Sequence, residues 1–279
     1  MRAAVSLAKR GRSKVSPNPM VGALIVKDGA IIGSGYHRKA GGGHAEINAI
    51  RRARESLAGA VMYVNLEPCC HHGKTPPCTE AIIKSGIRKV VAGTIDPNPL
   101  VSGRGVAVLR AAGLEVETGV LESECRELNG IFFTNMEKGR PFVTLKLAAT
   151  LDGKIADREG KGRWITSQSA RNEVRRLRCE NDAVVVGLGT VQADDPLLLP
   201  VDVKSGRKPV RIVLDPMLEM SPESRLAKTA KESRVIVFAS ESAPQKREAR
   251  IESASVEIVR TASKGDFLVL PDVLGKIHD

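Results

Sequence analysis

Two short segments contain most of the side chains that could do chemistry. The segment EPCCHHGKTPPC at residues 67–78 holds three cysteines and two histidines, and an isolated HAE triplet precedes it at residues 44–46. Thiolates and imidazoles are the ligands that zinc prefers, and a catalytic zinc site uses three of them and keeps one position open. Together the two segments predict a zinc site.

His44, Cys69 and Cys78 suit such a three-ligand site. Glu46 follows His44 on an expected helix, and residues two apart do not share a helical face, so Glu46 is placed to reach a bound water. Cys78 lies at the N-terminus of a second expected helix, Pro77–Lys84, whose dipole favours a thiolate. Zinc deaminases show this pattern, H-x-E followed by P-C and a second cysteine, with the glutamate transferring protons.

Other interpretations of the two segments stay open. Zinc could sit in a closed structural site made by Cys78 with residues 69–72, which would leave His44 as a helix-capping or core residue. Such a structural zinc module would have no catalytic role. A nucleic-acid deaminase of the tRNA type would also carry H-x-E and P-C, although eight residues separate Cys69 from Cys78 here and aromatic residues make up only 3% of the chain.

Composition narrows the class of protein. The chain has 279 residues, 42% of them hydrophobic and 27% charged, and no stretch long enough to cross a membrane. Its formal charge is +11, and residues 1–140 carry 20 Lys and Arg against 12 Asp and Glu, which suits an anionic partner. Five cysteines, an odd number, do not form a disulfide framework. We expect a cytoplasmic enzyme.

Strand and helix patterns alternate in the first half, which predicts an α/β domain. A Lys-Asp-Gly turn between Val21–Val26 and Ala30–Ile32 indicates a hairpin. Further strands are expected at 61–66, 88–95 and 114–120, and helices at 44–57, at Pro77–Lys84 and at 103–113. We place the boundaries of this domain at 1–138.

A second domain is expected at 139–279. Its predicted strands are 142–153, 182–189, 210–215, 233–239 and 256–260, with a helix at Ser169–Arg178. The chain ends in LPDVLGKIHD, which reads as the start of a helix that no strand follows. We therefore expect this second domain to be cut short.

Longer motifs resemble a known family. HAE, LEPCCHHGKTPPC and DPNPLVSGRG are similar to the deaminase domain of the bifunctional riboflavin-biosynthesis deaminase–reductases (RibD/RibG), and LKLAATLDGKIA, RWITS and VGLGTVQADDP match their reductase domain in the same order. The resemblance implies a three-layer α/β/α cytidine-deaminase-like domain, followed by an incomplete dihydrofolate-reductase-like domain. It also implies Zn²⁺ and NADPH as cofactors.

For the deaminase domain, the resemblance implies a phosphorylated substrate, 2,5-diamino-6-ribosylamino-4(3H)-pyrimidinone 5′-phosphate, that loses its 2-amino group. Asn18, His71 and Lys74 match substrate-contacting positions, although each could be an ordinary turn or loop residue. Cys70 stands where the family typically has serine, and is expected to be a small neighbour of the site. The stretch Asp96–Pro99 is expected to be a rigid turn and not catalytic.

For the reductase domain, the resemblance implies hydride transfer from NADPH to C1′ of the ribosyl group. The sequence GLGT at 187–190 does not make a Rossmann fingerprint, because Gln192 takes the third glycine position. The same resemblance assigns NADPH contacts to Ala148, Trp164, Thr190 and Asp194, and substrate contacts to Lys146, Thr166, Arg178 and Leu198.

This domain also departs from the family. Gly162 replaces a common serine, and Val201 replaces an arginine suited to phosphate. The chain stops before a V-E-G-G-type segment. We expect weak or absent reduction, a small-molecule partner, no nucleic acid or membrane, and a homo-oligomer.

Overall fold

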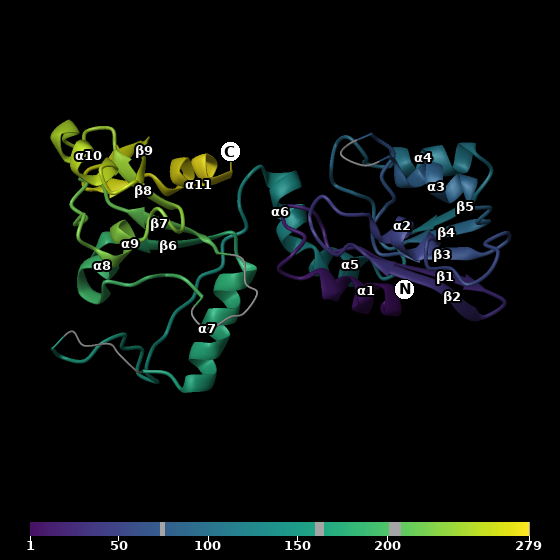
Figure 1. Ribbon diagram of the computed structural model, residues 1–279, viewed down its shortest axis with the longest axis horizontal. Coiled ribbons are helices and arrows are strands. Elements are labelled where there is room, and N and C mark those ends of the chain that lie inside the picture. Colours follow the sequence, from purple (N-terminus) through teal and green to yellow (C-terminus); the bar gives the residue numbers. More distant parts are fainter. Residues whose placement is uncertain (73–75, 160–164, 201–207, 279) are drawn as a thin grey trace. The chain divides into compact units, whose positions relative to one another are not determined.

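The computed structural model describes residues 1–72, 76–159, 165–200 and 208–278. Its chain forms two compact units, Met1–Phe142 and Val143–Asp279, which are coloured from purple to teal and from teal to yellow (Figure 1). Four residues discussed above lie outside the described ranges. Lys74 and Trp164 have roles implied by the family resemblance, and Gly162 and Val201 depart from the family pattern.

A five-stranded sheet forms the centre of the first unit, in the order β2-β1-β3-β4-β5. Its strands are β1 (Gly22–Lys27), β2 (Ala30–Tyr36), β3 (Val61–Val64), β4 (Lys89–Ala92) and β5 (Glu115–Thr118). β1 pairs antiparallel with β2 and β3, while β3, β4 and β5 run parallel. The expected hairpin is present, and Asp28 and Gly29 turn it with positive φ angles of 47° and 78°.

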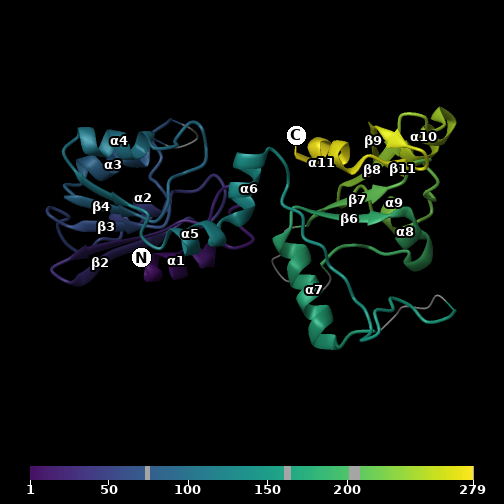
Figure 2. The same cartoon turned by 180° about the vertical axis from the view of Figure 1, so that it is seen from behind.

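Helices cover both faces of this sheet (Figures 1 and 2). One face carries α1 (Arg2–Ala8) and α5 (Glu122–Leu128), and the other carries α2 (Ala45–Ile50), α3 (Cys78–Lys84) and α4 (Arg104–Ala111). A short helix η1 (Lys9–Gly11) follows α1, and α6 (Gly130–Lys138) follows α5. The main core lies between the sheet and α2, with Ile25, Met62 and Val90 at its centre. The arrangement is the expected three-layer α/β/α domain.

Helix α2 is shorter than the sequence pattern predicts. It ends at Ile50, whereas the apolar spacing predicted a helix as far as residue 57. The backbone N–H of Arg54 donates to the carbonyl of Ile32, which draws the chain back onto β2. Gly35 explains the close packing of α2 on β2, because a Cβ atom there would overlap the backbone of Ala49.

The second unit contains a parallel sheet in the order β6-β7-β8-β9. Its strands are β6 (Ala183–Gly187), β7 (Val210–Leu214), β8 (Val235–Ser240) and β9 (Glu257–Thr261). Alternate residues of β7 and β8 enter two different cores, as expected for a sheet buried on both faces. The helices are α7 (Gln168–Glu180), α8 (Leu188–Asp194), α9 (Arg225–Lys228), α10 (Gln245–Glu252) and α11 (Leu270–His278), and β10 (Ser263–Lys264) pairs with β11 (Phe267–Leu268).

The predicted strand at 142–153 is wrong. Residues 141–149 have no regular secondary structure, and the side chains of Leu145 and Leu147 are 80% and 72% exposed. Thr150 and Lys154 then form a turn through the backbone N–H of Thr150 and the carbonyl of Lys154. The apolar alternation of this segment is real, but a strand also needs a neighbouring strand to accept its backbone hydrogen bonds.

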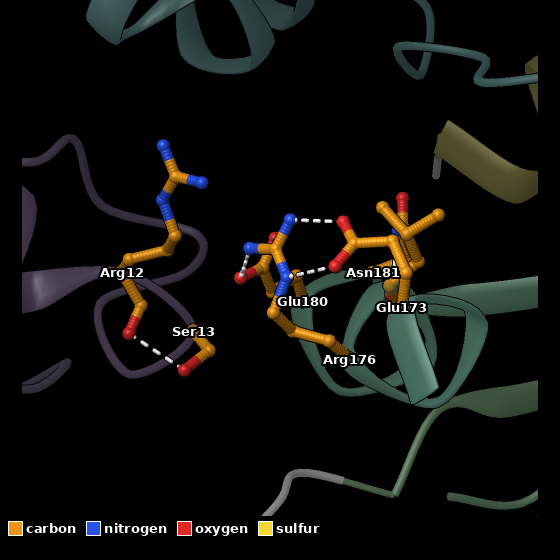
Figure 3. Close-up of polar contacts among 7 residues, drawn as sticks. Arg12, Ser13, Glu173, Arg176, Glu180 and Asn181 are labelled. Atoms are coloured by element: carbon orange, nitrogen blue, oxygen red, sulfur yellow. Dashed lines mark hydrogen bonds and ion pairs between the residues drawn. The ribbon is translucent and has the colours of Figure 1, made fainter. Parts of the chain in front are cut away.

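Helix α7 is held by polar contacts along its exposed side (Figure 3). The guanidinium group of Arg176 lies between two carboxylates, with Nε 2.9 Å from Glu173 Oε2 and Nη1 2.5 Å from Glu180 Oε1. Ser167 caps the N-terminus by accepting a hydrogen bond from the N–H of Ala170. Pairs at these helical spacings each stabilise a helix by about 0.2–0.5 kcal/mol.

Candidate metal and deaminase site

Three side chains from separate segments of the first unit meet at one point. His44 precedes α2, Cys69 follows β3, and Cys78 is the first residue of α3. The Nδ1 atom of His44 lies 3.2 Å from Cys78 Sγ and 3.4 Å from Cys69 Sγ. All three ligand atoms lie within 4.8 Å of one another. The structure therefore brings together the three residues that the spacing singled out.

The donor set fits zinc. Zinc–sulfur bonds of about 2.3 Å and zinc–nitrogen bonds of about 2.0–2.1 Å place tetrahedral ligand atoms roughly 3.5–3.8 Å apart. The distances of 3.2 and 3.4 Å from His44 Nδ1 to the two sulfurs are close to those values. Two thiolates and an imidazole with a fourth position left open are the ligands of a catalytic zinc site and not of a closed structural one.

The two thiols of the cluster share a hydrogen bond. That bond, from the thiol of Cys78, is the largest of the effects that lower the pKa of Cys69 to about 4. Hydrogen bonds from His44 and from the N–H of Cys78 act in the same direction, against the effect of burial. The same hydrogen bond, together with burial, raises the pKa of Cys78. A hydrogen bond to Cys69 also raises the pKa of His44. One thiolate is therefore already stabilised where a cation would bind.

Glu46 lies beside the cluster, in the first turn of α2, and is only 3% exposed. Burial raises the pKa of its carboxyl group to about 7, and the negative charge of Cys69 adds to the effect. A carboxyl group with a pKa near neutrality can both accept and return a proton at physiological pH. Its chemistry is that of a proton carrier next to a metal site.

A cavity of about 370 Å³ opens onto this cluster. It lies where the carboxyl ends of the parallel strands β3 and β4 meet the beginning of α2, which is a common place for ligand sites in α/β folds. The expected residues Asn18 and His71 line it, together with His44, Glu46 and Cys69. His71 Nδ1 is buried and has no hydrogen-bond partner among the described residues, so it is available to a ligand.

His37 is a residue of this cavity that the sequence did not single out. Burial lowers the pKa of His37, so the ring is neutral and has one donor and one acceptor nitrogen. Nδ1 lies 3.2 Å from the carbonyl oxygen of Gly43, and Nε2 lies 3.0 Å from Asn18 Nδ2. Nδ1 must donate to Gly43, so Nε2 accepts from Asn18. The amide oxygen of Asn18 is then the group left for a ligand.

Asp96 is a second such residue. It lines the cavity, although the stretch Asp96–Pro99 was expected only to turn the chain. Its carboxylate does shape that turn by accepting a hydrogen bond from the N–H of Asn98 at 2.8 Å. Burial raises the pKa of Asp96 to about 6. Asp96 is therefore a buried acid that lines the cavity as well as a turn residue, and the DPNP pattern gave no signal of its burial.

The neighbours of Cys69 point elsewhere. The Cys70 thiol lies 3.8 Å from the carbonyl oxygen of Leu100, and the exposed ring of His72 lies 3.3 Å from Glu80. Among the described residues, the cluster with metal-binding geometry contains His44 and neither of these side chains. This geometry favours the three-ligand site over a closed site built from residues 69–72.

The residues expected to serve the reductase are spread over the second unit. Thr190 and Asp194 are exposed on α8, and Leu198 is buried in the segment that follows. Arg178 of α7 donates from Nη1 to the carbonyl of Leu199 at 3.3 Å, which places it beside Leu198. Lys146 and Ala148 lie in the irregular segment 141–149, and Thr166 lies just before α7. The structure thus brings together Arg178 and the 195–199 segment.

None of the described helices is long and apolar enough to cross a membrane.

Family models match both units. Residues 1–94 match the cytidine and deoxycytidylate deaminase zinc-binding region, and residues 141–278 match the RibD C-terminal domain. The whole chain is 46% identical to the riboflavin biosynthesis protein RibD of Actinobacillus pleuropneumoniae and covers 74% of its length. Over 85% of the chain, it is 51% identical to RibD of Aquifex aeolicus, of which it covers 67%.

Solved structures give the same result. A deaminase/reductase of Thermotoga maritima is 46% identical to this chain, with a TM-score of 0.85. The match covers all of this chain and 76% of the Thermotoga chain. RibD of Acinetobacter baumannii is 39% identical, with a TM-score of 0.86, over 99% of this chain and 75% of its own. The chain therefore belongs to the RibD family, the bifunctional enzymes of riboflavin biosynthesis that join a zinc-dependent deaminase to an NADPH-dependent reductase.

Proposed function

We propose that the first unit removes the 2-amino group of 2,5-diamino-6-ribosylamino-4(3H)-pyrimidinone 5′-phosphate by hydrolysis. The observation that carries this proposal is the buried carboxyl group of Glu46, which lies beside the cluster of His44, Cys69 and Cys78 at the end of a cavity. The Thermotoga relative is described as a diaminohydroxyphosphoribosylaminopyrimidine deaminase. Its similarity to this chain supports the same substrate.

His44, Cys69 and Cys78 would hold the zinc ion, which when bound supplies a water of lowered pKa. Glu46 takes a proton from the attacking water and gives it to the ring nitrogen beside C2. The C2–O bond forms in the same step. Glu46 then takes the second proton, from the hydroxyl group now on C2, and gives it to the amino group. The C2–N bond breaks, ammonia departs, and an oxo group is left at C2. A pKa of about 7 suits both directions of transfer.

Other groups of the cavity would hold the substrate. The amide oxygen of Asn18, fixed by His37, would accept a hydrogen bond from the ring or an amino group. Nδ1 of His71 and the carboxyl group of Asp96 are further polar groups that line the cavity. Lys74 is assigned to the substrate from the resemblance alone.

For the second unit we propose NADPH-dependent reduction at C1′ of the ribosyl group. Ala148, Trp164, Thr190 and Asp194 are assigned to NADPH, and Lys146, Thr166, Arg178 and Leu198 to the substrate. We expect the reaction to be weak, because Gly162 and Val201 depart from the family and because Lys146 and Ala148 lie in an exposed irregular segment. The contact of Arg178 with Leu199 supports its assignment.

The proposal extends to assembly and location. The edge strand β6, whose Val185 is 44% exposed, supports association with a second copy of the chain. Five free cysteines support a reducing cytoplasm. We expect no nucleic-acid partner, since a cavity with few aromatic groups does not offer a stacking surface for bases.

Mass spectrometry of the substrate tests the proposal. The zinc-loaded protein is incubated with the diaminopyrimidine ribosyl phosphate, with and without NADPH. We expect an amino group to be replaced by an oxo group in both samples, with two further hydrogens in at most a small fraction and only with NADPH. An unchanged substrate in both samples would reject the assignment and direct the search to RNA substrates.

The substitution Glu46→Gln tests the proton-transfer role. It removes the titratable group while keeping the size of the side chain, so zinc content should be unchanged and turnover should fall by about 10²–10⁴-fold. Turnover equal to that of the unmodified protein would show that Glu46 is not the proton carrier. Loss of zinc in the same variant would instead point to a structural role.

A further inference from the structure

Glu67 is a buried carboxylate that the proposed mechanism does not use. It stands two residues before Cys69 and is 3% exposed. Its Oε2 accepts hydrogen bonds from the backbone N–H groups of Asp96 at 3.1 Å and Gly103 at 2.9 Å, and its Oε1 accepts one from Val106 at 3.0 Å. No cation pairs with it among the described residues. Three backbone dipoles, two of them at the start of α4, therefore stabilise its charge.

The same carboxylate joins three parts of the first unit. It belongs to the segment that carries the proposed ligand Cys69, it holds the turn that begins at Asp96, and it holds the first turn of α4. Its own N–H donates to the carbonyl of Thr94 at 2.9 Å, which ties the end of β3 to the end of β4. Two walls of the cavity thus meet at Glu67.

The contact between α4 and the ligand segment is tight. A Cβ atom at Gly105 would overlap the carbonyl oxygen of Pro68 and would lie 3.1 Å from Glu67 Oε1. On its other side, Cys69 accepts a backbone hydrogen bond from Thr79 at 3.2 Å, and its sulfur accepts one from the N–H of Cys78 at 3.4 Å. Cys69 is therefore held between α3 and the junction of Glu67 with α4.

We propose that Glu67 is a positioning residue, which fixes the proposed metal ligand Cys69 and the cavity wall at Asp96 relative to each other. This inference rests on the proposed metal site, and it gives Glu67 no contact with the reacting atoms. The carboxylate is required because it has acceptors for all three N–H groups at once. The amide of glutamine would have only one acceptor oxygen. Its NH2 group, which is a donor, would face at least one of these backbone N–H groups, so two donors would be opposed.

The test compares the variants Glu67→Gln and Gly105→Ala with Glu117→Gln. Glu117 is an exposed residue of β5 that pairs with Lys89, so it controls for the change of charge. Each protein is loaded with Co²⁺ in place of zinc, its visible absorption spectrum is recorded, and its Zn²⁺ affinity is measured by competition with a chelator. Loss of a group that orients a metal ligand typically lowers metal affinity by about 10–100-fold.

We expect Glu67→Gln and Gly105→Ala to lose the tetrahedral Co²⁺ spectrum or shift its bands, and to bind zinc at least about tenfold more weakly. The deaminase KM should rise and kcat should fall in the same variants, because ligand and wall move together. Glu117→Gln should keep the spectrum, the affinity and the activity of the unmodified protein.

Two results would overturn the proposal. An unchanged Co²⁺ spectrum and zinc affinity in a folded Glu67→Gln variant would show that Cys69 does not need Glu67. Loss of the cooperative unfolding transition would show that Glu67 supports the whole domain and not the site. If the unmodified protein gave a tetrahedral Co²⁺ spectrum but no deamination, the proposed function would fail while the role of Glu67 could still be judged from the metal.

Discussion

The ring of His37 fixes the amide of Asn18, whose Nδ2 lies 3.0 Å from His37 Nε2. Because burial lowers the pKa of His37, the ring stays neutral near pH 7 and Nε2 remains an acceptor. The backbone carbonyl of Gly43 accepts a hydrogen bond from Nδ1–H, which sets this tautomer. The orientation of the Asn18 amide in the cavity wall is thus determined by His37, which lines the same cavity.

The substitution His37→Phe should therefore weaken substrate binding. It removes the hydrogen bond that orients Asn18, which is worth about 1 kcal/mol, so kcat/KM should fall roughly fivefold to tenfold, mainly through KM. Steady-state kinetics of ammonia release measures the change. The same substitution at His278, on α11 of the second unit, is the control. Unchanged kinetics in His37→Phe would mean that Asn18 needs no such support.

The cluster geometry predicts different outcomes for two adjacent cysteines. Cys69→Ser should reduce bound zinc from about one equivalent to nearly none, because a neutral hydroxyl is a poor replacement for a thiolate. Cys70→Ser should leave zinc content unchanged, since the Cys70 thiol faces the carbonyl of Leu100. Metal analysis after gel filtration measures both. Equal loss in the two variants would favour a closed structural site.

In the metal-free protein, the contribution of Glu46 to the free energy of unfolding should fall as the pH rises through the range 4.5 to 7, whereas the lowered pKa of Cys69 acts in the opposite direction. The pKa of Glu46 is about 7 in the folded chain against an ordinary value of 4.5, so in this range the folded state binds a proton that the unfolded state does not. Deprotonation then costs the folded state about 3 kcal/mol by pH 8. Urea unfolding of the unmodified protein and of a Glu46→Gln variant, each at pH 4.5 and pH 8, measures this contribution.

The variant Glu46→Gln isolates this contribution, because its amide cannot titrate. Its free energy of unfolding should match that of the unmodified metal-free protein at pH 4.5 and exceed it at pH 8. Parallel pH profiles for the two proteins would contradict the raised pKa of Glu46.

The exposure of the segment at 141–149 predicts that substitutions there have little effect on the free energy of unfolding. Leu145→Lys and Leu147→Lys should each change the free energy of unfolding by less than about 0.5 kcal/mol, since both side chains already face solvent. Phe238→Ala, in the core of the same unit, should cost about 3–5 kcal/mol. Urea denaturation compares them. A large loss from either lysine variant would show that the segment packs as a strand.

The site was more predictable from the sequence than the segments around it. His44, Cys69 and Cys78 carry their chemistry in their residue types, and their spacing is short enough to be read as one motif. The sequence did not predict the positions of His37 and Asp96 in the cavity, because these depend on burial and on contacts with other segments. Burial of a polar side chain depends on tertiary contacts that no local pattern records.

The same reasoning explains the errors in the fold. The apolar spacing after His44 continues to residue 57, but a backbone hydrogen bond from Arg54 to β2 ends α2 at Ile50. The apolar alternation at 142–153 has the period of a strand, but the segment does not pair with a strand among the described residues. The strands β6 to β9 were predicted well. The central strands β7 and β8 are buried on both faces, and a strand of this kind is a mainly apolar run that needs little context.

Two hydrogen bonds join the ends of the stretch between Cys69 and Cys78. The N–H of Thr79 donates to the carbonyl of Cys69, and the N–H of Cys78 donates to the sulfur of Cys69. A loop closed at its base in this way can be exchanged for one of another length or composition while both ligands stay in place. Selectivity among amino-substituted rings could thus diverge, in evolution or by grafting, independently of the hydrolytic chemistry.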